Sequence, residues 1–557
     1  MKKQRRRIYA ALLCSSMVLS LVSMPVSAAE TGQLTNPPTS TEGPGSPESA
    51  SGNEAAAVLN GLYAALPVAN GVKEVATADE LTDALADSSI SIITLKDDVE
   101  ISSTLTVNRT VTLDLNGNVL KMTGSDSVIK VEADGDLTIQ DRNTTTQHTF
   151  NPHCKYQFWY IDMWELDKDG SEIVSGGVIT GGGGDQNNGG GVLVAGGTLT
   201  MAGGSIVGCS ARSRGGGVYL GKDSDTGKSG TFIMTSGSII GCAAQLGGGV
   251  YVTSGCTFVM ATSSNIHNCI ANNDGGGVIN HGTFQMRGGT ISTCTTVAFG
   301  GGGVCNNGTF IMSDGMIKGC TSPDGQYASG GGVRNSNQFT MTGGMIGDPD
   351  NENDASHVYN TSSQETTLTI SGNAKIYTDI TNVGILNADG GEIAGTMTND
   401  TNRYGTGTIT GSEGAAGSTE FQDKVTNNGT IRKGTFTNEV INESSGTING
   451  GTFTGTVENK DGTISGGDFS KATLNGMLVI TFDPDNEDQS ITQKVNWSKD
   501  GATLTAPDPV PTKEGHGIEG WYYDNNGTET KWNFDTDTVK CTMTLKAKWE
   551  LSTYSVT

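Results

Sequence analysis

Cysteine and methionine recur at fixed positions in the middle of this chain, and both side chains can bind a soft metal ion such as Cu(I). The positions are Met201, Met234, Met260, Met286, Met312 and Met341, followed by Cys209, Cys242, Cys269, Cys294 and Cys320. Each cysteine follows a methionine by eight or nine residues, and the sequence contains no Cys-x-x-Cys and no histidine pair beside them. Because both residues pack well in apolar interiors, the pattern favours core packing. We expect no metal site and no cofactor.

A second kind of chemistry, glycan cleavage, needs paired carboxylates or a base with a cation. The candidates are Asp97-Asp98, His281-Gly282, a dipeptide similar to one in polygalacturonases, and Arg334. Asp97-Asp98 lies far from the other two, and the segments around His281 offer Gly, Thr and Ser where partner acids would be needed. The sequence therefore predicts no catalytic residues and no cluster of acid, Arg and His on one wall.

Aromatic residues concentrate in "HTFNPHCKYQFWYIDMWEL" (148–166), inside an insertion that spans 144–172. The candidates for ligand binding are Tyr156, Trp159, Tyr160 and Trp164, with Phe158 between them. Such rings can stack on sugar faces. The alternative interpretation is a hairpin that packs its aromatic side chains against the outside of the domain.

Two short patterns resemble metal sites only in part. His148, His153 and Cys154 lie close in sequence, but a fourth ligand is not evident. "GGGGDQNNGG" (181–190) lacks the second copy that a calcium-binding repeat requires. We interpret this glycine-rich segment as a corner between strands.

The elements that position these residues follow from an internal repeat, whose commonest period is 26 residues. Valine follows a glycine run at Val192, Val218, Val250, Val278, Val304 and Val333, and an apolar residue recurs at Leu199, Phe232, Phe258, Phe284, Phe310 and Phe339. A regular period of this length is typical of a solenoid. The 81 glycines disfavour helical repeats, and the spacing lacks the leucines of a leucine-rich repeat. Three short strands with glycine corners fill one coil of a parallel β-helix.

Stacking of such coils about 4.8 Å apart would place like residues in columns inside the tube. The chain without Cys14 holds nine cysteines, and neighbouring coils bring Cα atoms close enough for disulfides. Five of them share one inward orientation, and the total is odd. We therefore favour a column of buried, reduced thiols, with cross-linked coils as the alternative.

The N-terminal residues have the features of a secretory signal peptide, with basic "MKKQRRR", an apolar run and a small-residue site ending at Ala28. We expect residues 1–28 to be removed and residues 29–71 to form a disordered Pro/Ser/Thr-rich leader. A short helix behind Thr77-x-x-Glu80 would then cap the solenoid. The net charge of −25 disfavours nucleic acid as a partner. The predicted mature chain has no transmembrane segment.

Residues 351–476 change to a shorter repeat rich in Gly, Thr and Asn. Ile431, Ile448 and Ile464 recur every 16–17 residues. We predict a narrower continuation of the same solenoid, and a stack of hairpins is the alternative.

The helix-capped start, "TVTLDLNGNVL" and the "GGGV…GTF" coils resemble the pectin-lyase-like right-handed β-helix proteins exported by gut Gram-positive bacteria. This resemblance implies an all-β fold with a parallel β-helix over 72–350. Residues 477–550 resemble the Listeria–Bacteroides repeat, or internalin B-repeat, a small β-grasp-like module of surface proteins. The matching residues are Phe482, Pro511 to Gly515, Gly520-Trp521-Tyr522, Trp532, Phe534 and Ala547 to Trp549. The segment "PDNEDQ" and Ile518 depart from that pattern.

These features predict a secreted or cell-surface protein, associated with the cell wall, that acts in adhesion. Its expected partner is a host or bacterial surface glycan or protein. The alternatives are a polysaccharide lyase or glycoside hydrolase of the same fold, and a structural spacer. Residues 551–557 have the alternating pattern of a first strand, so another repeat is expected to follow, with a natural stop at Thr557 as the alternative.

Overall fold

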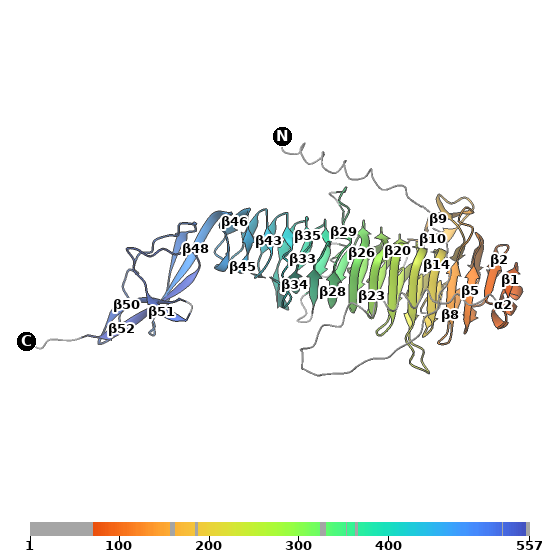
Figure 1. Ribbon diagram of the computed structural model, residues 1–557, viewed down its shortest axis with the longest axis horizontal. Coiled ribbons are helices and arrows are strands. Elements are labelled where there is room, and N and C mark those ends of the chain that lie inside the picture. The colour runs from red at the N-terminus through yellow and green to blue at the C-terminus, as the bar shows by residue number, and fades with distance from the viewer. Residues whose placement is uncertain are drawn as a thin grey trace, which may run out of the picture. The chain divides into compact units, whose positions relative to one another are not determined.

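The chain folds as a stack of short strands, seen in a computed structural model that describes residues 71–155, 162–183, 188–323, 330–351, 354–361, 366–525 and 527–552. The predicted signal peptide and nearly all of the predicted leader lie outside the described residues, as does most of the tail. From β1 (Val72–Val75) onward the strands line up side by side along the stack (Figure 1). Within the described residues, α2 (Ala78–Ala86) is the only helix.

One wall of the stack carries the repeated valines, and we call it the valine wall. Each of its strands pairs in parallel with the strand of the next coil, so that Val250 lies opposite Val278. Its strands are β4 (Leu105–Val107), β7 (Ile129–Val131), β13 (Val192–Ala195), β16 (Val218–Gly221), β19 (Val250–Val252), β22 (Val278–Asn280), β25 (Val304–Asn306), β27 (Val333–Asn335), β30 (Val358–Asn360), β33 (Ile380–Asn382), β36 (Met397–Asn399), β41 (Val425–Asn427), β44 (Val440–Asn442) and β46 (Thr456–Asn459).

The other walls hold the Phe, Met and Ile positions on long strands and a few short strands after the cysteines. Phe232 lies opposite Phe258, again in parallel register. The long strands are β14 (Thr198–Val207), β17 (Thr231–Ile240), β20 (Thr257–His267), β23 (Thr283–Ser292) and β26 (Thr309–Lys318), and the short ones are β15 (Ser210–Arg214), β18 (Ala243–Leu246), β21 (Ile270–Ala271) and β24 (Thr295–Thr296). The predicted parallel β-helix is confirmed.

The first coils are built in the same way around the capping helix. Thr77 Oγ1 accepts a hydrogen bond from Glu80 N at 3.3 Å, and Glu80 Oε2 accepts one from Ala76 N at 2.8 Å. Thr77 and Glu80 thus close the helix start as predicted, although Glu80 bonds the amide before the N-cap and not that of Thr77 itself, and Leu81 and Ala84 of α2 lie in the core. The early strands are β2 (Ile92–Leu95), β3 (Val99–Ile101), β5 (Thr110–Asp114), β6 (Val119–Met122), β8 (Asp136–Gln140) and β12 (Val178–Thr180).

Like residues stack in columns inside the coils, as the repeat predicts. The rings of Phe232 and Phe258 have centroids 4.8 Å apart and planes 6° apart. The last glycine of each triplet leaves room for the Ile and Cys columns, since a Cβ on Gly277 would lie 3.0 Å from Ile291 Cγ2 and 3.3 Å from Cys294 Sγ. The repeated residues therefore form a packed core.

A buried asparagine ladder accompanies these columns, and it was not predicted from the sequence. Each side-chain Nδ2 donates to Oδ1 of the next member, at 2.8 Å between Asn280 and Asn306. The ladder runs through Asn280, Asn306, Asn335, Asn360, Asn382, Asn399, Asn427, Asn442 and Asn459. The bonds satisfy amides that would otherwise be costly to bury.

Residues 351–476 continue the solenoid. Ile431 pairs in parallel with Ile448, and Phe436 with Phe453, so the alternative of stacked antiparallel hairpins is wrong. Beyond the valine wall the strands are β28 (Gln338–Met341), β29 (Met345–Ile346), β31 (Thr367–Ile370), β32 (Lys375–Ile376), β34 (Ile385–Ala388), β35 (Glu392–Ile393), β39 (Thr408–Thr410), β40 (Glu420–Phe421), β42 (Thr430–Ile431), β43 (Thr435–Phe436), β45 (Thr447–Phe453) and β47 (Thr463–Asp468), with a hairpin of β37 (Thr401–Asn402) and β38 (Gly405–Thr406).

The C-terminal module consists of β48 (Thr473–Asp483), β49 (Ile491–Asn496), β50 (His516–Asn525), β51 (Thr528–Lys531) and β52 (Met543–Leu551). Its last strand, β52, pairs in parallel with β48 and antiparallel with β50. Phe482 packs edge-on against Trp521, with centroids 5.1 Å apart. This is the small β-grasp-like module that the sequence predicts.

Candidate functional site

The outer face of the valine wall carries a row of unusual side chains at one position of successive coils. Because side chains alternate along a strand, the residue after each inward valine points outward. These residues pair in register from coil to coil, and we call them the outer row: Leu193, Tyr219, Tyr251, Ile279, Cys305, Arg334 and Tyr359. In a chain with only 6% aromatic residues, this row collects three tyrosines.

Aromatic rings and a guanidinium group meet at the start of this row. The rings of Tyr219 and Tyr251 stack with centroids 5.5 Å apart, and His281 lies 5.5 Å beyond Tyr251. The Arg214 guanidinium lies 5.4 Å from the centre of the Tyr251 ring. Burial lowers the pKa of His281 and Arg214 lowers it further, so the imidazole is neutral at pH 7.

An ion pair lies further along the same face. Arg334 Nη1 is 3.8 Å from Asp274 Oδ1, and Cys305 Sγ is 4.0 Å from the same oxygen. Burial raises the pKa of Asp274, while Arg334 opposes that shift. Within the described part of the chain, Arg334 Nε is buried without a hydrogen-bond partner. The Arg334 side chain as a whole is 28% exposed, so an acceptor can reach the guanidinium group only through its other atoms.

Glycines bring two of these charged residues onto the row. Arg214 and Asp274 each stand directly before the first glycine of a triplet. That glycine has a left-handed φ, +68° at Gly275, and a Cβ there would lie 2.7 Å from Ile279 Cβ. The loops thus lie tightly over the wall, which leaves Ile279 only 2% exposed although it points away from the core.

The valine wall thus carries an acid, two arginines and a histidine on one face, but Asp274 contacts Arg334 whereas His281 contacts Tyr251, and the absence of catalytic residues stays a prediction. His281 and Arg334, which the sequence analysis considered separately, share this face with Asp274 and Arg214. Spacing alone did not show this, because Arg214 ends the short strand β15 and Asp274 lies in a loop, so neither belongs to the strands of the valine wall. We call Arg214, Tyr219, Tyr251, Asp274, His281 and Arg334 the outer cluster.

The other acidic candidate, Asp97-Asp98, has a structural role. Asp98 Oδ1 accepts a hydrogen bond from Val119 N at 2.8 Å and so joins two coils near the capping helix. A bonded carboxylate in this place stabilises the turn that it closes.

The insertion forms an antiparallel sheet of β9 (Gln147–Lys155), β10 (Asp162–Leu166) and β11 (Glu172–Ser175), in the order β10-β9-β11. Trp164 is 7% exposed and packs with Phe150, Val207 and Ile240 on the outside of the solenoid. The position of Trp164 agrees with the alternative interpretation, a hairpin that packs its aromatic side chains against the outside of the domain. Tyr156, Phe158, Trp159 and Tyr160 lie outside the described residues.

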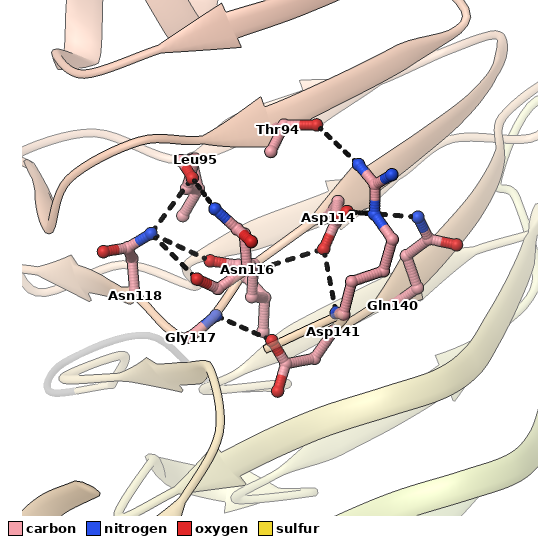
Figure 2. A network of polar contacts seen from close by, with 10 residues as sticks. Thr94, Leu95, Asp114, Asn116, Gly117, Asn118, Gln140 and Asp141 are labelled. Atoms are coloured by element: carbon pink, nitrogen blue, oxygen red, sulfur yellow. Dashed lines mark hydrogen bonds and ion pairs between the residues drawn. The ribbon is translucent and has the colours of Figure 1, made fainter. Parts of the chain in front are cut away.

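A polar network fixes the base of the insertion (Figure 2). Asp141 Oδ1 accepts from Gly117 N at 2.7 Å, and its Oδ2 accepts from Gly177 N at 2.8 Å, so the residues on either side of the insertion are held together. The fully buried Asp114 accepts from Asn116 N at 3.0 Å and contacts the side chain of Arg142. The "LDLNGN" segment is thus a scaffold for the insertion.

The histidines and cysteine of the insertion are not brought together as a metal site. His148 Nε2 lies 3.0 Å from Gly117 O, whereas Cys154 lines a cavity of about 580 Å³ with Trp164, Glu165 and Lys121. Burial, followed by Glu165, raises the pKa of Cys154 to about 11. Groups of three or more His, Cys, Asp or Glu side chains placed to hold a metal ion are absent from the described residues.

The nine cysteines of the described residues are all free, and seven of them are buried. The thiols of the internal column donate weak hydrogen bonds to backbone carbonyl groups, as Cys294 does to Ser292 O at 3.3 Å. Burial raises the pKa of Cys269 and of Cys294, which keeps both as thiols. These contacts agree with the reduced column and not with cross-linked coils.

Comparison with known proteins identifies both ends of the described chain. Residues 479–548 match the family model described as "Listeria-Bacteroides repeat domain", which includes the packed Phe482 and Trp521. The chain carries a Listeria–Bacteroides repeat. Ahead of that repeat, residues 72–181 match the family model described as "Putative pectate lyase-like adhesive domain". That range covers the capping helix, the first coils and the insertion.

Two proteins of Evansella cellulosilytica share a short stretch with this chain. One, named "Putative Gly-rich membrane protein", is 55% identical over 56 residues, and the other, named "Putative membrane protein", is 48% identical over 56 residues. These stretches are 10% of this chain and only 6% and 8% of those proteins. The comparison with solved structures found no match. Among the described residues, no helix is long and apolar enough to cross a membrane.

Proposed function

We propose that this protein is an extracellular adhesion protein, exported by its signal peptide to a bacterial surface, and that it binds a surface glycan along the outer cluster. A pectate lyase-like adhesive domain and a Listeria–Bacteroides repeat in one chain are the combination of a surface adhesion-type protein. The outer cluster supplies the binding chemistry.

The observation that carries this proposal is the row of stacked rings beside two guanidinium groups. Tyr219 and His281 are partly exposed, so their rings can make apolar contacts with sugars. Arg214 and Arg334 offer donors to carboxylate or sulfate groups of a glycan, in a chain whose net charge is −25. Because the row follows successive coils, it suits an extended chain that lies along the solenoid.

The test is an array of surface glycans and matrix proteins probed with the mature protein and two variants. We expect selective glycan binding that weakens at least about tenfold in Tyr219→Ala/His281→Ala, since aromatic residues dominate such contacts. The matched control is Tyr404→Ala, which removes a 62% exposed tyrosine that also lies beside an arginine, Arg403, at 4.5 Å. Equal binding by both variants, or no selective glycan, would contradict the proposal.

A second candidate is polysaccharide cleavage at the same face, favoured by His281 and Arg334 lying on one wall. Against it, the Asp274 carboxylate is paired with Arg334, and the close contact of His281 is an aromatic ring. An enzyme needs an acid or base within reach of the proton that it transfers. Release of reducing or unsaturated ends that stops in His281→Gln would favour cleavage.

A further inference from the structure

The C-terminal end of a solenoid is a liability, because its last coil exposes a core and a strand edge. In this chain that end meets the Listeria–Bacteroides repeat. Three features of the last coil make contacts with the repeat. They are a strand, the two internal columns of side chains, and the backbone edge.

The strand β48 belongs to both parts. Residues Thr473–Gly476 pair in parallel with Thr456–Asn459 of the solenoid wall. The following residues of the same strand, 477–482, pair antiparallel with β49 of the repeat. A strand that is hydrogen-bonded on both sides of the boundary leaves no linker between the two parts.

The internal columns end on groups supplied by the repeat. The stack of phenylalanines ends at Phe469, whose ring meets Trp497 edge-on with centroids 5.0 Å apart. Trp497 is held in place because its Nε1 donates to Lys540 O at 3.1 Å. The last member of the asparagine ladder, Asn459, donates to Met477 O at 2.6 Å.

The backbone edge of the last coil is also paired. Thr542 N donates to Ile464 O at 2.7 Å, and Ile464 N donates to Thr542 Oγ1 at 3.1 Å. One threonine of the repeat thus satisfies both polar groups of a residue that would otherwise be open to another strand. Lys494 adds a contact of 2.7 Å to Asp461.

We propose that the Listeria–Bacteroides repeat is the C-terminal cap of this solenoid, and that it blocks pairing of the last coil with a second copy of the chain. The repeat and the coils then form one cooperative unit. This role is separate from glycan binding, because it uses the last coil, whereas the outer cluster lies on the earlier coils around β16 to β27.

The cap is tested with Trp497→Ala/Thr542→Val, which removes the ring contact and one of the two edge bonds. Sedimentation velocity should show concentration-dependent self-association of the variant. Hydrogen exchange of the peptide holding Ile464 should rise at least about tenfold, because its amide loses its acceptor. The matched control is Tyr522→Ala, an aromatic of the repeat whose contacts are Glu519 and Lys548. A variant that stays monomeric and exchanges like the control would overturn the proposal.

A second measurement uses the unchanged chain, so it does not depend on how the variant folds. Four of the six tryptophans lie in the repeat, and most strands lie in the solenoid. Tryptophan fluorescence and far-UV circular dichroism should therefore report the same unfolding transition on heating. Two separate transitions would show that the repeat is an independent domain and not a cap.

Discussion

Gly241 lies directly beneath Trp164: a Cβ atom on Gly241 would sit 2.1 Å from Trp164 Cγ. Both backbone groups of Gly241 are hydrogen-bonded: its N donates to His267 O at 3.1 Å, and its O accepts from Trp164 N at 3.0 Å. The insertion therefore docks on the solenoid only where the residue before the column cysteine has no side chain. The same position in later coils holds Asn268 and Thr293, also with positive φ.

The variant Gly241→Ala should undock the insertion. The matched control is Gly319→Ala, with φ of +61° against +58° at Gly241, where a Cβ would meet only Thr293 Cγ2 at 3.6 Å. Both changes cost about 1–2 kcal/mol from the left-handed backbone, and Gly241→Ala should cost about 1–3 kcal/mol more from overpacking. Faster limited proteolysis within 144–172 in Gly241→Ala alone is the expected result. Equal proteolysis of the two variants would argue against this docking.

Replacing one asparagine of the ladder should lower the stability of the protein. Asn335→Ala removes one acceptor of the Asn306 amide and leaves the buried carbonyl oxygen of Asn360 without its ladder donor, so the free energy of unfolding should fall by about 3 kcal/mol or more. Asn438→Ala, at an exposed corner, is the control and should change it by less than about 0.5 kcal/mol. Urea denaturation followed by circular dichroism measures both. A loss at Asn335 no larger than that at Asn438 would contradict the ladder's role.

The cysteines should react in two classes. In the native protein, a thiol reagent at pH 7 should reach at most Cys154 and Cys541, which are the two partly exposed cysteines. Reaction should be slow, because burial raises the pKa of both thiols. In denaturant without reductant, all nine should react. One reactive thiol or none would show that the coils are cross-linked.

Stability should fall as the pH is lowered from about 7 towards 5. Burial lowers the pKa of His267, opposed by Glu172, and burial and Arg214 lower that of His281. The unfolded chain then takes up protons first, near pH 6.5, so the stabilisation is present above that pH and is lost below it. The raised pKa of Asp274 acts in the opposite sense. His267→Gln/His281→Gln should flatten the dependence of melting temperature on pH between 7 and 5, and an unchanged slope would refute this assignment.

The fold was predictable because its core repeats. Phe258, Met260, Ile266 and Cys269 each recur at the same period. A regular period predicts stacked coils even when no contact between residues is known. The asparagine ladder carried the same signal, since an asparagine follows Val278, Val304 and Val333 by two residues, but the sequence analysis did not use it. The outer cluster carried a weaker signal, since Arg214 and Asp274 lie outside the valine wall in the sequence, and their approach to it depends on the glycines that follow them.

The burial of Trp164 could not be read from the sequence either. Aromatic residues in an insertion fit an exposed platform and a packed hairpin equally well, and the choice depends on the space that Gly208 and Gly241 leave. At Gly208 a Cβ would lie 1.9 Å from Trp164 O. Both glycines directly precede column cysteines, and nothing in that spacing indicates that they make room for a tryptophan.

The central claim, that the outer cluster binds a glycan, is tested most directly by hydrogen exchange of the mature protein with and without the glycan selected on the array. The account predicts slower exchange in the segments that hold Arg214 to Tyr219, Asp274 to His281, and Arg334, with the insertion and the C-terminal repeat unchanged. Slower exchange confined to the insertion or to the repeat would contradict it and place the binding site elsewhere.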